Sequence, residues 1–116
     1  MNPAGGMTFA QCERRCAEQL ARFFPEAVPI HVPVQVTALR AGKRSLVERT
    51  ILEYRAGQHA IFSSGLPLEF DDRLWLEPHD GGNPLSAVVI AVRYHDGSKA
   101  VAVRLERGAG DWMGES

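Results

Sequence analysis

The sequence predicts an all-β fold, a six-stranded antiparallel barrel preceded by one helix, on three observations. Apolar residues recur at helical spacing as far as Phe24 and then switch to alternation from Pro29 onward. Six short alternating runs follow, separated by glycine, proline and aspartate turn signals. Short strands joined by tight turns are typical of antiparallel barrels and sandwiches, and closure into a barrel removes the exposed sheet edges.

The composition is that of one soluble globular domain. The chain has 116 residues, of which 45% are hydrophobic and 23% charged. Its formal net charge of -1 argues against non-specific nucleic-acid binding, which needs a basic surface. No apolar run approaches the ~20 residues of a membrane span, and the N-terminus lacks the pattern of a signal peptide. We therefore expect a cytoplasmic protein with no nucleic-acid partner and no membrane insertion.

The chain divides into an N-terminal extension, residues 1–28, and a barrel domain, residues 29–116. A helix is predicted over about residues 8–24, because Thr8 and Gln11 have the spacing of a capping box and Pro25 ends the helix. Its apolar stripe consists of Phe9, Cys12, Cys16, Leu20 and Phe23. A helix with one apolar stripe must bury it. We expect the stripe to pack on the barrel or, alternatively, on a partner chain, including a second copy.

Cys12 and Cys16 lie four residues apart, on one face of the predicted helix. We interpret both as small buried apolar side chains, with a metal or redox pair as the alternative. Metal would need further ligands from the four histidines, none of which has a recognisable spacing. The sequence therefore predicts no metal site and no cofactor. The histidines are His31, His59, His79 and His95.

The first strand runs from Pro29 to the end of an alternation at Thr37, and it begins at a sheet edge because proline cannot donate to a ladder. The other strands are predicted over residues 46–54, 59–62, 73–77, 87–94 and 99–106. In the second strand, Leu52 and Tyr54 are placed on one face. Hairpin tips are expected at residues 41–43 and 96–97. The predicted core comprises Val34, Val36, Leu52, Val89, Val101 and Val103.

Most of the barrel sequence resembles a PilZ domain, over roughly residues 32–112. The stretches that carry the resemblance are VPVQV, ERTILEYRAGQHAIFSSGLPLEFDDRLWL and SAVVIAVRYHDGSKAVAVRLE. The Leu-Pro-Leu loop, the Tyr-His-Asp-Gly hairpin and the ending around Trp112 also resemble features of that family. The resemblance implies a PilZ-like barrel and, in most members, binding of the bacterial second messenger cyclic di-GMP.

Members of the family bind this ligand with two motifs, and the second falls on the turn after the second strand. It reads [D/N]-x-S-x-x-G and aligns with Glu53 to Gln58. Glu53 replaces the shorter acidic or amide residue, Arg55 replaces a small hydroxyl, and Gln58 replaces the last glycine. Gly57 remains, but the turn alone explains a glycine there.

The first motif, R-x-x-x-R just before the first strand, is missing, because residues 24–31 contain no arginine. Arginine forks suit guanine edges and phosphate oxygens, so their loss removes strong contacts. The same spacing occurs at Arg40 and Arg44, but inside the first hairpin. We interpret these two as a solvated hairpin tip.

These departures predict a non-catalytic PilZ-like domain that has lost the usual cyclic di-GMP binding. It is expected to act as a protein-interaction adaptor in type IV pilus, motility or surface machinery, with a homodimer through the N-terminal helix as one arrangement. The alternative is a cyclic di-GMP receptor that uses Arg55, Arg40 and Arg44. An enzyme is not expected, because Ser63 and Ser64 lack the strand-turn-helix context of a nucleophile elbow.

Overall fold

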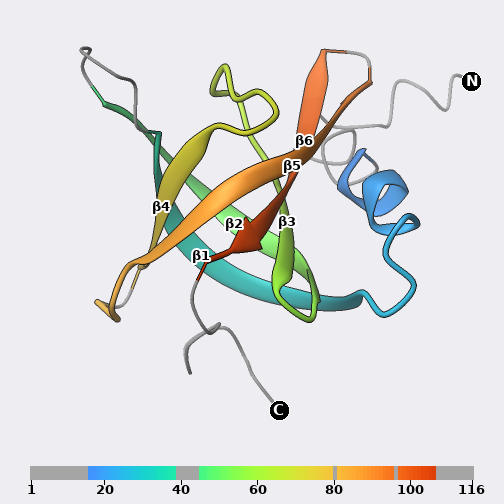
Figure 1. The fold of residues 1–116 in the computed structure, drawn as a ribbon, viewed down its shortest axis with the longest axis horizontal. Helices are drawn as coiled ribbons and strands as arrows, with labels where there is room; N and C mark the ends of the chain where they lie inside the picture. Colours follow the sequence, from blue (N-terminus) through green and yellow to red (C-terminus); the bar gives the residue numbers. More distant parts are fainter. Residues whose placement is uncertain (1–15, 39–44, 80, 96, 107–116) are drawn as a thin grey trace, which may run out of the picture.

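The six predicted strands close into one antiparallel barrel, which confirms the fold class (Figure 1). The computed structural model describes residues 16–38, 45–79, 81–95 and 97–106. The strands are β1 (Val28–Ala38), β2 (Leu46–Ala56), β3 (His59–Ser63), β4 (Arg73–Pro78), β5 (Leu85–His95) and β6 (Ser98–Leu105). Their order around the barrel is β1-β2-β3-β6-β5-β4.

Strands that follow one another in the sequence pair as neighbours, except between β3 and β4. The barrel closes through two further pairings, β3 with β6 and β1 with β4. Ile61 opposes Ala102 in the first, and Val36 opposes Leu76 in the second. The β3–β4 connection, residues 64–72, therefore has to cross from one side of the barrel to the other.

The first half of β1 lies at an edge, as its prolines predict. The β1–β4 ladder begins only at Val34, so the earlier residues of β1 pair with β2 alone. Pro29 and Pro33 both lie in this half, where the missing N–H interrupts no ladder to β4. The Pro33 carbonyl accepts a hydrogen bond from the His79 backbone N–H at 3.1 Å.

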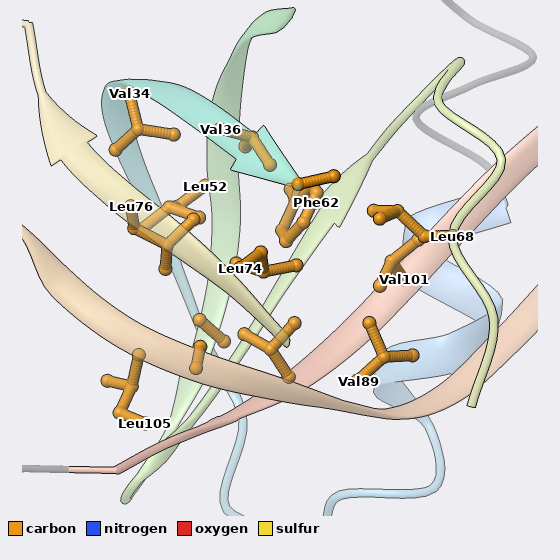
Figure 2. Packing of buried hydrophobic residues seen from close by; sticks show 14 residues of the cluster. Val34, Val36, Leu52, Phe62, Leu68, Leu74, Leu76, Val89, Val101 and Leu105 are labelled. Atoms are coloured by element: carbon orange, nitrogen blue, oxygen red, sulfur yellow. The ribbon is translucent and has the colours of Figure 1, made fainter. Parts of the chain in front are cut away.

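The barrel interior contains all six predicted core residues, and each is buried. Phe62 is the largest fully buried side chain, and Leu74, Leu76 and Leu105 belong to the same core cluster. Figure 2 shows Leu68, from the β3–β4 loop, beside Val89 and Val101 at one end of the core. The loop therefore closes part of the barrel with an apolar side chain.

The predicted placement of Leu52 and Tyr54 on one face is wrong. Leu52 belongs to the barrel core, whereas Tyr54 packs with the second cluster, on the outside of the barrel. The ladder between β2 and β3 shifts register between these two residues. A bulge of this kind adds one residue to a strand and resets the alternation of its faces.

The described part of the N-terminal helix, residues 16–21, packs on the outside of the barrel. Its buried side chains, Cys16, Ala17, Leu20 and Ala21, contact Ile61, Ala100 and Ala102. Of the described stripe residues, Cys16 and Leu20 thus dock on the barrel. The expected cap at Thr8 and the position of Cys12 lie outside the described residues.

The helix ends at Ala21, three residues earlier than expected. The N–H groups of Phe23 and Phe24 bond to carbonyls three residues back, which tightens the chain into a turn. Phe23, predicted to belong to the apolar stripe, is consequently 70% exposed.

Candidate functional site at the β2–β3 turn and the β3–β4 loop

Gly57 and Gln58 form a two-residue turn between β2 and β3. Gly57 has φ of +62°, and Gln58 does not have a positive φ, which is the pattern of a type II′ hairpin turn. The Arg55 Nε donates to the Gly57 carbonyl at 3.1 Å. The Leu105 N–H donates to the Gln58 carbonyl at 2.8 Å, which ties the turn to the end of β6. The turn is therefore held by its own backbone and by a neighbouring side chain.

The structure brings only some of the predicted site residues together. Arg55 and Gly57 are in contact, but the Glu53 carboxylate accepts a hydrogen bond from the Ser63 hydroxyl at 3.3 Å. Arg55 stands in register with Ala60, a residue of the barrel core, so its side chain starts from the opposite side of the strand to Tyr54. Arg40 and Arg44 lie outside the described residues.

The segment between the helix and β1 lies beside this turn. A Cβ built on Gly57 would have the Glu26 carboxylate oxygen Oε2 at 3.8 Å as its nearest neighbour. The rings of Phe24 and His59 lie 5.3 Å apart at 49°, and the His59 Nδ1 is 3.3 Å from the Ala56 carbonyl. The Glu26 carboxylate thus lies near Gly57, and the Phe24 and His59 rings pack together beside the turn.

The first half of the β3–β4 loop is fixed to the barrel by polar contacts. The Glu48 carboxylate accepts hydrogen bonds from the Ser64 hydroxyl and from the Gly65 N–H, both at 2.7 Å. The Lys99 ammonium donates to the Leu66 carbonyl. Together with buried Leu68, these contacts hold the loop across the end of the barrel.

The tip of this loop presents Phe70 to solvent on a tight turn. The Asp72 carboxylate accepts from the Glu69 N–H at 2.9 Å, and Asp71 has a positive φ of 75°. The Asp71 N–H donates to the Val89 carbonyl at 2.8 Å, and the Val89 N–H returns a bond to Asp72 at 2.9 Å. Phe70 is nevertheless 72% exposed. The backbone around it is well bonded, so the ring is displayed from a defined position.

The sequence predicts only a loop in this region, with no role for Phe70. The available signal was one aromatic residue inside the acidic stretch Glu69-Phe70-Asp71-Asp72, at a position where a loop residue is normally polar. Exposure of the ring depends on the turn that Asp71 makes, and that conformation has no reliable sequence pattern.

Cys16 is a buried thiol, as the sequence predicts, and Cys12 lies outside the described residues. The Cys16 Sγ donates to the Arg93 carbonyl at 3.2 Å. Burial raises the pKa of the Cys16 thiol, and this outweighs the Ala100 backbone hydrogen bond and the Arg93 charge, which both lower it. The thiol is therefore protonated at neutral pH and acts as a packing group.

No protein-family model matches the chain, and no curated protein matches it either. Among the residues that the structure describes, no group of three or more His, Cys, Asp or Glu side chains could hold a metal ion. Within the same residues, no helix is long and apolar enough to cross a membrane.

Proposed function

We propose that the chain is a non-catalytic PilZ-like domain of bacterial signalling. It acts as a protein-interaction adaptor in type IV pilus, motility or surface machinery, and it does not bind cyclic di-GMP in the way usual for that family. The sequence resemblance and the six-stranded barrel support the PilZ-like assignment. The surroundings of the β2–β3 turn support the loss of ligand binding.

The observation that carries this proposal is the Glu26 carboxylate beside Gly57. In ligand-binding members of the family, the segment before the first strand supplies two arginines. Here that segment places an acidic group at the turn, where it would repel the two phosphates of cyclic di-GMP. Arg55 contributes a cation at the turn, and its Nε bonds to the Gly57 carbonyl. The segment before the first strand thus places an acidic group at the turn instead of the family's two arginines.

Phe70 supports the adaptor role. Aromatic side chains dominate the energy of many protein interfaces, and a rigid backbone lowers the entropy that binding costs. The ring lies between the exposed acidic residues Glu69 and Asp71. A partner that fits this turn would have an apolar pocket with a basic rim.

Site-specific photo-cross-linking in the bacterium that encodes the chain tests this role. A photoreactive phenylalanine analogue at position 70 should give one discrete adduct, identified by mass spectrometry. The same analogue in place of Glu18, which is exposed on the helix, should not give that adduct. The adduct should be unaffected when cellular cyclic di-GMP is raised. Folded protein that gives no adduct at position 70 would contradict the adaptor proposal.

A further inference from the structure

The outer face of β4, β1 and β2 carries an exposed apolar row. Thr37 of β1 stands in register with Val47 of β2 and with Trp75 of β4. Residues directly opposite one another in a sheet project from the same face, and Val36 beside Thr37 points into the core. All three side chains therefore project outward. Val47 is 55% exposed and Trp75 41% exposed. Figure 1 shows β4 and the helix on opposite sides of the barrel.

A charged row lies next to the apolar one on the same face. Gln35 stands in register with Arg49 on β2 and with Glu77 on β4, and both charged residues are exposed. The Gln35 amide donates to the Glu77 carboxylate at 3.4 Å. With His79, these residues line a shallow pocket of about 240 Å³. The pocket end of the face thus has a positive Arg49 on β2 and a negative Glu77 on β4, with the apolar row beside them.

We propose that this face binds a second copy of the chain, face to face, around a twofold axis that runs along β1. Such a rotation exchanges the β2 side with the β4 side. Arg49 then lies over Glu77 of the partner subunit, and Val47 lies over Trp75 of the partner subunit. Each contact occurs twice, as in any isologous interface. The complementarity of the face to itself is the reason to choose a second copy over an unrelated protein.

The proposed dimer uses neither Phe70 nor the β2–β3 turn, and it does not depend on the proposed function. It also differs from a dimer through the N-terminal helix, whose described side chains Cys16, Ala17, Leu20 and Ala21 contact the barrel. Three strands about 4.8 Å apart bury a surface area well below the roughly 800 Å² that each partner buries in a stable complex. The dimer is therefore weak, with a dissociation constant on the order of 100 µM.

Sedimentation equilibrium of the full chain tests the dimer, over about 10 µM to about 1 mM, a range that brackets weak association. We expect a monomer–dimer equilibrium. Arg49→Glu alone and Glu77→Arg alone should each weaken it about tenfold, because like charges then face one another. Combining both changes in one chain should restore the dimer. Mixing the two single variants should also restore association, now between unlike chains.

Arg104→Glu is the matched control, since Arg104 is an exposed arginine on β6 and should leave the equilibrium unchanged. Thermal unfolding of each variant shows that it is folded. A chain that stays monomeric over the whole range overturns the proposal. So does a dimer that is insensitive to the single reversals, or one that neither the double variant nor the mixture restores.

Discussion

Leu52 and Tyr54 are two residues apart on β2, yet they pack on opposite sides of the barrel wall. Leu52 opposes Phe62 in the interior, and Figure 2 shows both among the core side chains. Tyr54 opposes Ile61 on the outside, in the cluster where the helix docks. The bulge between them therefore lets a single strand serve the barrel core and the helix-docking surface.

Replacing Val103 by Asp should remove several kcal/mol of the free energy of unfolding. Val103 is fully buried, so the carboxylate would lie unpaired among apolar side chains. Urea denaturation measures the change. The control is Arg104→Gln, next to it on β6 and exposed, which should shift stability by less than about 0.5 kcal/mol. An unchanged melting temperature for Val103→Asp would contradict the inward face assigned to β6.

Leu20→Ala should destabilise the protein by about 2 kcal/mol, the low end for a buried leucine, because the site borders solvent and can relax. Leu20 is buried between the helix and the barrel. Glu18→Ala, exposed on the same helix, should have almost no effect on the denaturation midpoint. Equal stabilities for the two variants would mean that the helix does not dock as described.

The Cys16 thiol should resist alkylation in the folded protein. In a Cys12→Ser chain, iodoacetamide should modify Cys16 much more slowly in the native state than in urea, because burial raises its pKa and blocks access. Because the thiol pKa is raised in the folded state, the thiol contributes to the free energy of unfolding, and this contribution is fully present at pH values below the ordinary thiol pKa of 9.0. That contribution should be lost as pH rises from there through the folded-state pKa. Equal alkylation rates in both states would disprove the buried thiol.

Gly57→Ala should cost about 1–2 kcal/mol, because a residue with a Cβ is strained at φ of +62°. The cost comes from the backbone, since the nearest atom to the added carbon would be at ordinary contact distance. Gly57→Asn should cost less, because asparagine adopts the left-handed region more readily. Chemical denaturation of the two variants checks this order. If both variants were as stable as the parent protein, the conclusion that the turn requires glycine at position 57 would be wrong.

Much of the fold follows from local patterns in the sequence. Alternating valines placed β1 and β6, and the buried valines were identified because a strand has a period of two. Pro29 and Pro33 correctly indicated a free edge. The bulge before Tyr54 was not predicted, because one inserted residue leaves no compositional sign and appears only when two strands are aligned.

The candidate surfaces are also hard to predict, because they appear only once the strands are aligned with one another. Trp75, Thr37 and Val47 form one row only after the register of β4, β1 and β2 is known. Glu26 is far from Gly57 in the sequence and lies near it because β1 pairs with β2, with Val28 opposite Arg55. Sequence patterns indicate which residues are unusual, whereas closure of the barrel decides which of them become neighbours.

A repaired chain provides the positive control for ligand binding. It restores the family pattern at the turn and adds two arginines before and at the start of β1, where they can reach guanine edges and phosphates. This chain should bind cyclic di-GMP. Its substitutions are Glu53→Asp, Arg55→Ser, Gln58→Gly, Ala27→Arg and His31→Arg.

Calorimetric titration of the unmodified protein with cyclic di-GMP tests the central claim most directly. Each lost charge-assisted hydrogen bond removes about 1.5–3 kcal/mol, so the loss of several moves micromolar binding to millimolar or weaker. We predict no binding heat at tens of micromolar ligand, alongside clear binding by the repaired chain. Binding by the unmodified protein in the low micromolar range, abolished by Arg55→Ala, would contradict the account and identify the β2–β3 turn as a rebuilt ligand site.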